Sequence, residues 1–132
     1  MLMLKSTVLA IAAAGLASSA FAADHSAIRR QIAKLDPQTR LEQRCNGRAI
    51  GRIARERKGM SPEEVVAYAF ADTIKSEHAM KAPGAAFRSK GKWYHLSYNC
   101  HTTDDNMSIV SFDYRIGAVV PRSEWSKHYL VP

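Results

Sequence analysis

Five arginines recur along one stretch of the chain, separated by four residues in three steps and by three in the last: Arg40, Arg44, Arg48, Arg52 and Arg55. In a helix, residues three or four positions apart are neighbours on the surface, so this spacing predicts one cationic edge. Guanidinium groups bind phosphates and carboxylates. The row therefore predicts a binding site for an anionic partner, either a cell-envelope component or an acidic protein. The alternative is an ordinary solvated helix face.

The charge of the chain is placed unevenly. The 132 residues carry a net charge of +7, and ten of the nineteen basic residues but three of the twelve acidic ones lie between Arg29 and Lys58. A field of this kind favours anionic partners. Nucleic acid is not expected, because the aromatic residues are not interleaved with the basic ones as a single-strand binding platform requires.

A second group of basic and aromatic residues contains Arg88, Trp93 and His95, with Lys90 and Lys92 between them. In a strand, Trp93 and His95 share one side, opposite to Tyr94 and its alternating neighbours. An exposed aromatic ring beside cations predicts a possible ligand or glycan contact. The alternative is that Trp93 belongs to the core.

The sequence contains no recognisable catalytic or metal motif. The run Cys100-His101-Thr102-Thr103-Asp104-Asp105 fits no zinc or calcium spacing. No Gly-x-Ser-x-Gly elbow and no glycine-rich phosphate loop occurs. We therefore expect no catalytic residue, metal or cofactor. The enzymatic alternative is a small hydrolase that uses His95, His101 and Asp104, and a further alternative is a protein inhibitor.

The first twenty-two residues have the pattern of a secretory signal peptide. Lys5 precedes an apolar run from Thr7 to Leu16, and Ala20-Phe21-Ala22 is a small-x-small cleavage signal. The apolar run is shorter than the ~20 residues that span a bilayer, so no transmembrane segment is expected. These residues predict an exported, periplasmic protein with a signal peptide at 1–22 and a single domain at 23–132.

Export decides how the two cysteines are interpreted. Cys45 and Cys100 are the only cysteines of the chain. In an oxidising compartment, an even number of cysteines in a small domain predicts a disulfide.

Two helices are expected before residue 60. A short amphipathic helix is predicted from His25 to Ala33. Asp36 is a suitable N-cap and Pro37 a suitable first helical residue for a second helix that ends near Lys58, before Gly59. The apolar edge of that second helix consists of Leu41, Cys45, Ala49 and Ile53.

The next segment is ambiguous. Ser61, Pro62 and Glu64 form a helix-start pattern, which predicts a third helix from Pro62 to Phe70 or Asp72. The alternative is a strand through Val65–Phe70, because a short apolar run does not distinguish the two structures.

From Ala82 the pattern alternates with a period of two, which predicts antiparallel strands. A tight turn at Lys90-Gly91 leads into a strand at 93–100, and a turn at 103–106 leads into a strand at 107–116. A short turn or helix at 123–126 is expected to lay Trp125 against the sheet. The expected fold is α+β, with the N-terminal helices packed on a three- or four-stranded antiparallel meander. The inward face is predicted to contain Tyr94, Leu96, Tyr98, Cys100, Val110, Phe112, Tyr114 and Ile116.

Several short segments, in this order, resemble the family called domain of unknown function 930. They are Leu35-Asp36-Pro37, Leu41-Glu42-x-Arg44-Cys45, Ala67–Asp72, Ala82–Tyr94, Tyr98-x-Cys100, Ser111–Gly117 and Pro121-x-x-x-Trp125. The resemblance implies a small exported protein of alphaproteobacteria and transfers no activity. Together with the charge, it favours a non-enzymatic binding or envelope-interaction module.

Overall fold

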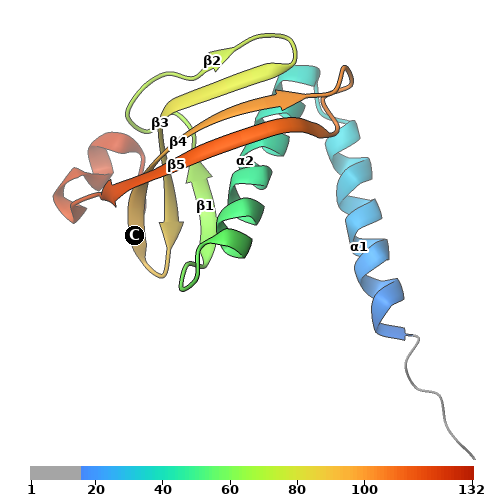
Figure 1. Ribbon diagram of the computed structural model, residues 1–132, viewed down its shortest axis with the longest axis horizontal. Coiled ribbons are helices and arrows are strands. Elements are labelled where there is room, and N and C mark those ends of the chain that lie inside the picture. The colour runs from blue at the N-terminus through green and yellow to red at the C-terminus, as the bar shows by residue number, and fades with distance from the viewer. Residues whose placement is uncertain (1–15) are drawn as a thin grey trace, which may run out of the picture.

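The structure is a computed structural model that describes residues 16–132, and it consists of helices followed by an antiparallel sheet (Figure 1). The elements are α1 (Leu16–Ala33), α2 (Pro37–Glu56), β1 (Pro62–Val66), β2 (Ile74–Lys75), β3 (Ala79–Ser89), β4 (Lys92–Thr102), β5 (Ile109–Val119) and the 3-10 helix η1 (Arg122–His128). The predicted α+β class is confirmed. The sheet has five strands, with the order β1-β3-β4-β5, and β2 also pairs with β3.

The predicted signal peptide lies mostly outside the described residues, which exclude 1–15. Its proposed cleavage point, after Ala22, falls within α1. Among residues 16–132, no helix is both long and apolar enough to cross a membrane.

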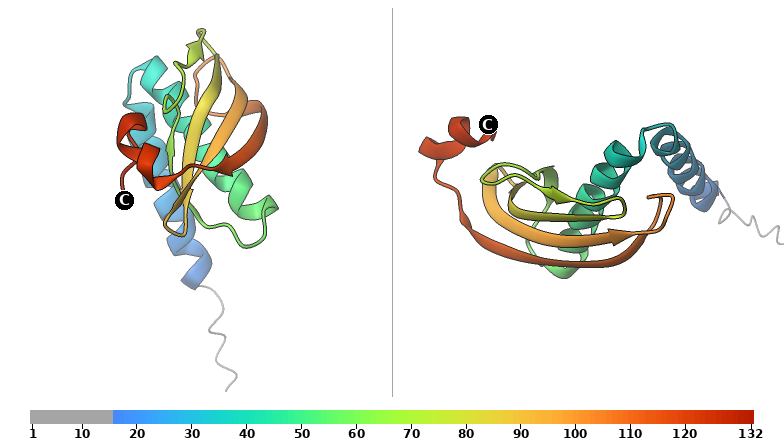
Figure 2. Two further views of the ribbon diagram at one scale, coloured as in Figure 1. Left: turned by 90° about the vertical axis from the view of Figure 1, so that its left-hand side faces the viewer. Right: turned by 90° about the horizontal axis from the view of Figure 1, so that it is seen from above.

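Helix α2 fills the concave side of the curved sheet (Figure 2). Its start is as predicted: the Asp36 carboxylate accepts hydrogen bonds from the backbone N–H groups of Gln38 at 3.1 Å and Thr39 at 3.0 Å. The predicted apolar edge is also confirmed, because its four residues are completely buried against the sheet: Leu41, Cys45, Ala49 and Ile53.

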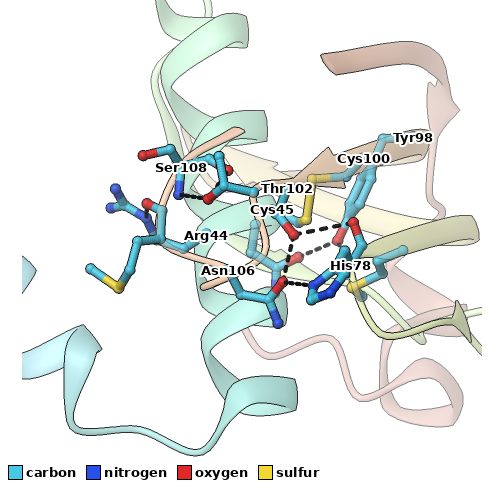
Figure 3. Close-up of a disulfide and its surroundings, with 12 residues drawn as sticks. Arg44, Cys45, His78, Tyr98, Cys100, Thr102, Asn106 and Ser108 are labelled. Atoms are coloured by element: carbon cyan, nitrogen blue, oxygen red, sulfur yellow. Dashed lines mark hydrogen bonds between the residues drawn. A yellow bond between two sulfur atoms is a disulfide. The ribbon is translucent and has the colours of Figure 1, made fainter. Parts of the chain in front are cut away.

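The two cysteines connect this helix to the middle of the sheet (Figure 3). The sulfur atoms of Cys45 on α2 and Cys100 on β4 are 2.11 Å apart, which confirms the predicted pairing. Both residues are fully buried. The disulfide therefore lies within the core, where it fixes the helix on the sheet.

The predicted third helix is wrong. The alternative, a strand at Val65–Phe70, is right only for Val65 and Val66, because residues 67–70 form a turn and the observed strand is β1 (Pro62–Val66). This strand pairs with β3, with Val65 opposite Phe87 and Val66 opposite Ala86. Val65 packs against the inner core, which lies between α2 and the sheet, and Val66 belongs to a smaller outer core on the opposite face of the sheet. Because consecutive residues of a strand point to opposite faces, only a strand buries both valines against these two clusters. Tertiary pairing thus overrides the local helix-start pattern.

The inward face of the sheet is as predicted except at the start of β5. Val110 is 67% exposed, and Ile109 packs on the inner core in its place. The register shifts here, since Thr102 pairs with Ile109 while His101 pairs with Ser111. The extra residue of this β-bulge turns Val110 outward, and the alternation resumes after it.

The outer face of the sheet has its own smaller core at the end distant from α1. Trp93 of β4 is fully buried there beneath Trp125 of η1 and Leu130. The Trp93 indole N–H donates to the carbonyl of Val131 at 2.8 Å. The predicted packing of Trp125 against the sheet is confirmed.

Candidate functional site: a cationic groove between the two helices

A groove of about 510 Å³ runs between α1 and α2. Three arginines of the row, Arg44, Arg48 and Arg55, line it from α2. The remaining lining residues are His25, Ile28 and Ile32 of α1, Gln43, Gly47 and Gly51 of α2, and Ile109 of β5. None of the lining residues is acidic, so the groove presents positive charge without an internal counter-ion.

Helix geometry explains why three of the five arginines meet and two do not. Successive residues are rotated by roughly 100°, so each step of four advances by roughly 40° around the axis. Arg44, Arg48 and Arg55 therefore fall within a sector of roughly 40°. Arg40 and Arg52 lie at the two extremes, roughly 120° apart. The row turns around the helix, and the two arginines at its angular extremes, Arg40 and Arg52, do not line the groove.

Arg44 is held in place at the floor of the groove. Its Nε donates to the carbonyl of Met107 at 2.6 Å (Figure 3). Burial, followed by repulsion from Arg29 and Arg48, lowers the pKa of the half-buried Arg44 guanidinium. The positive charges of this region therefore repel one another, and an anion bound between them would relieve that repulsion.

Arg48 and Arg55 have no hydrogen bond or ion pair with any other part of the chain that the structure describes. The Arg55 guanidinium lies over Gly51, where a Cβ atom would come within 3.1 Å of Nη1. Both side chains are thus available to an anionic ligand.

Arg40 is committed to the fold. Its Nη1 donates to the carbonyl of Asp105 at 2.7 Å, and its Nη2 donates to those of Ala33 at 2.9 Å and Leu35 at 2.8 Å. These bonds join the end of α1, the connection to α2 and the β4–β5 turn. The predicted role in binding an anion does not fit this placement, because both terminal nitrogens already donate to carbonyls of the chain and the remaining nitrogen, Nε, is buried.

Arg52 is also engaged within the molecule. It forms an ion pair with Glu56 and donates from Nη1 to the Phe112 carbonyl at 3.2 Å. Its guanidinium lies 5.6 Å from the centre of the Tyr114 ring, and the Tyr114 hydroxyl donates to Glu56 at 2.8 Å. Arg52 therefore covers the free edge of β5 and lies apart from the groove.

The second predicted group does not form an exposed aromatic contact. Trp93 is buried in the outer core, so the alternative placement is the correct one. Arg88 lies over its ring at 5.7 Å and is neutralised by Glu63 at 3.3 Å and Glu64 at 3.6 Å. His95 packs on Phe70, with ring centres 4.2 Å apart. These residues are explained by packing.

The residues of the hydrolase alternative are not brought together. His95 and His101 lie on the same strand, six residues and therefore roughly 20 Å apart. Asp104 is exposed in the β4–β5 turn. Across residues 16–132, no group of three His, Cys, Asp or Glu side chains is placed to hold a metal ion.

Sequence reasoning missed the apolar wall of the groove and the buried polar residue that joins the β4–β5 turn to the start of α2. Asn106 is 1% exposed, and its side chain accepts from Thr102 at 2.7 Å and donates to the carbonyls of Pro37 at 3.0 Å and Glu77 at 3.1 Å. The side-chain oxygen of Asn106 also lies 3.0 Å from Nδ1 of the His78 ring (Figure 3). The sequence signal for this residue was the turn at 103–106, since Asn tolerates the positive φ of 56° found there.

The sequence profile of the family described as Domain of Unknown Function (DUF930) matches residues 32–130, which include most of the groove. No curated protein and no solved structure matches the chain.

Proposed function

Because the chain belongs to the DUF930 family, whose description names no activity, we propose its function from the groove: a non-enzymatic, periplasmic protein that binds an anionic component of the cell envelope. The observation that carries this proposal is the meeting of Arg44, Arg48 and Arg55 in one groove whose lining contains no acidic residue. Arginines in such a place bind phosphate groups through several charge-assisted hydrogen bonds.

Export is part of the proposal. The pattern of residues 1–22 supports it, and so does the disulfide, because such bonds persist in oxidising compartments. The mass of the protein recovered from the periplasm of an expressing bacterium tests this directly. We expect the mass of residues 23–132 with two fewer hydrogens than the reduced chain. A protein that stays in the cytoplasm with residues 1–22 attached would contradict it.

Binding is tested with vesicles that contain phosphatidylglycerol, over a series of salt concentrations. The variant R48E/R55E reverses two charges in the groove. The matched control K92E/K127E makes the same change in net charge at two exposed lysines outside the groove.

We expect the wild type and the control to bind at low salt and to weaken as salt screens the charges. We expect R48E/R55E to lose at least tenfold in affinity. Equal losses in both variants would show that net charge alone is responsible. Binding that is indifferent to salt would contradict the electrostatic basis of the proposal.

A further inference from the structure

We propose that the groove binds a single-chain anionic amphiphile, with the arginines on its charged head and the apolar wall on its hydrocarbon chain. This inference rests on the proposed function and specifies the class of ligand. The reason to go beyond a simple anion is that half of the groove is built from apolar residues and glycines.

The apolar wall comes from α1 and β5. Ile28 and Ile32 of α1 face it, together with Ile109 of β5. Ile28 is 53% exposed, although it belongs to the apolar side of an amphipathic helix. Large aliphatic side chains gain free energy when they are removed from water. A hydrocarbon chain in the groove would cover Ile28, which the protein itself leaves uncovered.

The α2 side of the groove is smooth where a chain would lie. A Cβ atom added to Gly47 would meet no atom within 4 Å, whereas Gly51, one helical turn further along, lies beneath the Arg55 guanidinium. Glycine inside a helix costs up to about 1 kcal/mol relative to alanine, so the presence of Gly47 in α2 needs a reason. Space for a ligand supplies one.

The dimensions suit an elongated ligand. The lining residues of α2 extend from Gln43 to Arg55, which is roughly 18 Å along the helix axis. The volume of about 510 Å³ lies within the range of roughly 300–1,000 Å³ found for small-molecule sites. A lone phosphate would fill only a small part of this space. Every α1 residue that lines the groove follows residue 22, so removal of the predicted signal peptide leaves the lining intact.

The test separates head from chain with three probes, measured by isothermal titration calorimetry below their micelle concentrations. Dodecyl phosphate has both the charge and the chain, ethyl phosphate has the charge without the long chain, and dodecyl maltoside has the same chain with an uncharged head. The protein is the full processed chain from the periplasm. We expect dodecyl phosphate to bind one molecule per chain, at least tenfold more tightly than either of the others.

The variant Gly47→Leu tests the position of the chain. It fills the open space above Gly47 and raises helix propensity, so it is expected to fold, which circular dichroism verifies. Its matched control, Ala118→Leu, adds the same side chain at an exposed position of β5 outside the groove. We expect Gly47→Leu to lower the affinity for dodecyl phosphate at least tenfold and to leave the affinity for ethyl phosphate unchanged. We expect Ala118→Leu to leave both affinities unchanged.

The outcomes distinguish the two proposals. If ethyl phosphate binds as tightly as dodecyl phosphate, or if Gly47→Leu binds dodecyl phosphate like the wild type, the amphiphile is refuted and anion binding stands. If dodecyl maltoside binds as tightly as dodecyl phosphate, the arginines do not recognise the charged head, and the anionic amphiphile is refuted. If no anionic probe binds and vesicle binding is also absent, both proposals fail.

Discussion

The disulfide between Cys45 and Cys100 should supply a large share of the stability of this domain. It closes a loop with a sequence separation of 55 residues. In the chain-entropy description, a cross-link of this length removes enough freedom from the unfolded chain to stabilise the fold by about 4 kcal/mol. Domains of this size have total stabilities of about 5–15 kcal/mol. Reduction should therefore leave a protein that is marginally stable or unfolded.

Guanidinium denaturation measures this effect in two complementary ways. The first compares the oxidised protein with protein that is reduced while unfolded and refolded in reductant, because the buried sulfurs are out of reach in the folded state. The second uses the variant C45A/C100A. Its free energy of unfolding should fall somewhat more than reduction alone lowers it, because the substitutions also leave a small cavity. As a control, reductant should not change the midpoint of C45A/C100A.

Two results would refute this reasoning. One is a reduced protein with the same denaturation midpoint as the oxidised one, since the loop would then contribute nothing. The other is a native exported protein in which mass spectrometry finds two free thiols. In that case the helix and the sheet would be held by packing alone.

Four further predictions concern individual residues. Asn106→Ala should cost about 2–3 kcal/mol in denaturation, because it leaves two carbonyls without their donor, and a loss below about 0.5 kcal/mol would refute that role. Burial, followed by the charge of Glu42, raises the pKa of Tyr98 above 10.0, so the unfolded chain releases this proton first. Stability should fall as pH rises above about 10, and less steeply in Tyr98→Phe; equal slopes would exclude Tyr98 as the cause. Gly84→Ala should cost about 1–3 kcal/mol, because its Cβ would lie 2.5 Å from the backbone nitrogen of Ala71, and an unchanged midpoint would contradict this contact. Arg40→Gln should speed hydrogen exchange in α1 but not in the middle of α2, whereas equal rates in α1 would show that Arg40 does not hold it.

The sequence predicted an element correctly where its capping residues, apolar spacing or turn residues agree with the way the element packs in the fold. The start of α2 was fixed by Asp36, and its buried edge by the spacing of apolar residues. The turn at Lys90-Gly91 has the positive φ angles of 50° and 75° that a two-residue hairpin prefers. The segment from Pro62 was not predictable in this way. Its residues resemble a helix start, but Glu64 forms an ion pair with Arg88 instead of capping a helix. The segment forms a strand because pairing with the edge of β3 lets Val65 and Val66 pack on opposite faces of the sheet.

The candidate site was predictable in its charge but not in its shape. The row of arginines was visible, but a row with a spacing of four drifts around a helix, and only coordinates show which members face the same neighbour. Arg40 and Arg52 differ from the others in their angle around the helix, but the carbonyl groups of Asp105 and Phe112 to which they donate come from distant parts of the chain that the spacing does not reveal. Gly47 and Gly51 were visible as weak points of a helix. The open space beside Gly47 depends on the position of α1, and the cover over Gly51 depends on the Arg55 side chain, and no local pattern specifies either.

The two walls of the groove are held with different strength, and this difference bears on the ligand. Helix α2 is fixed by the disulfide and by a completely buried apolar edge. Residues 23–33 of α1 form a helix too short to be stable alone, and Arg40 fastens only its last turn. A ligand that contacts Ile28 would add the apolar packing that this helix lacks, and by linkage its binding would stabilise α1 more than any other element. Slower hydrogen exchange in residues 24–33 on addition of dodecyl phosphate, with no change under dodecyl maltoside, is therefore the signature expected of a chain bound between the helices. Protection that spreads evenly over the sheet instead would place the ligand elsewhere.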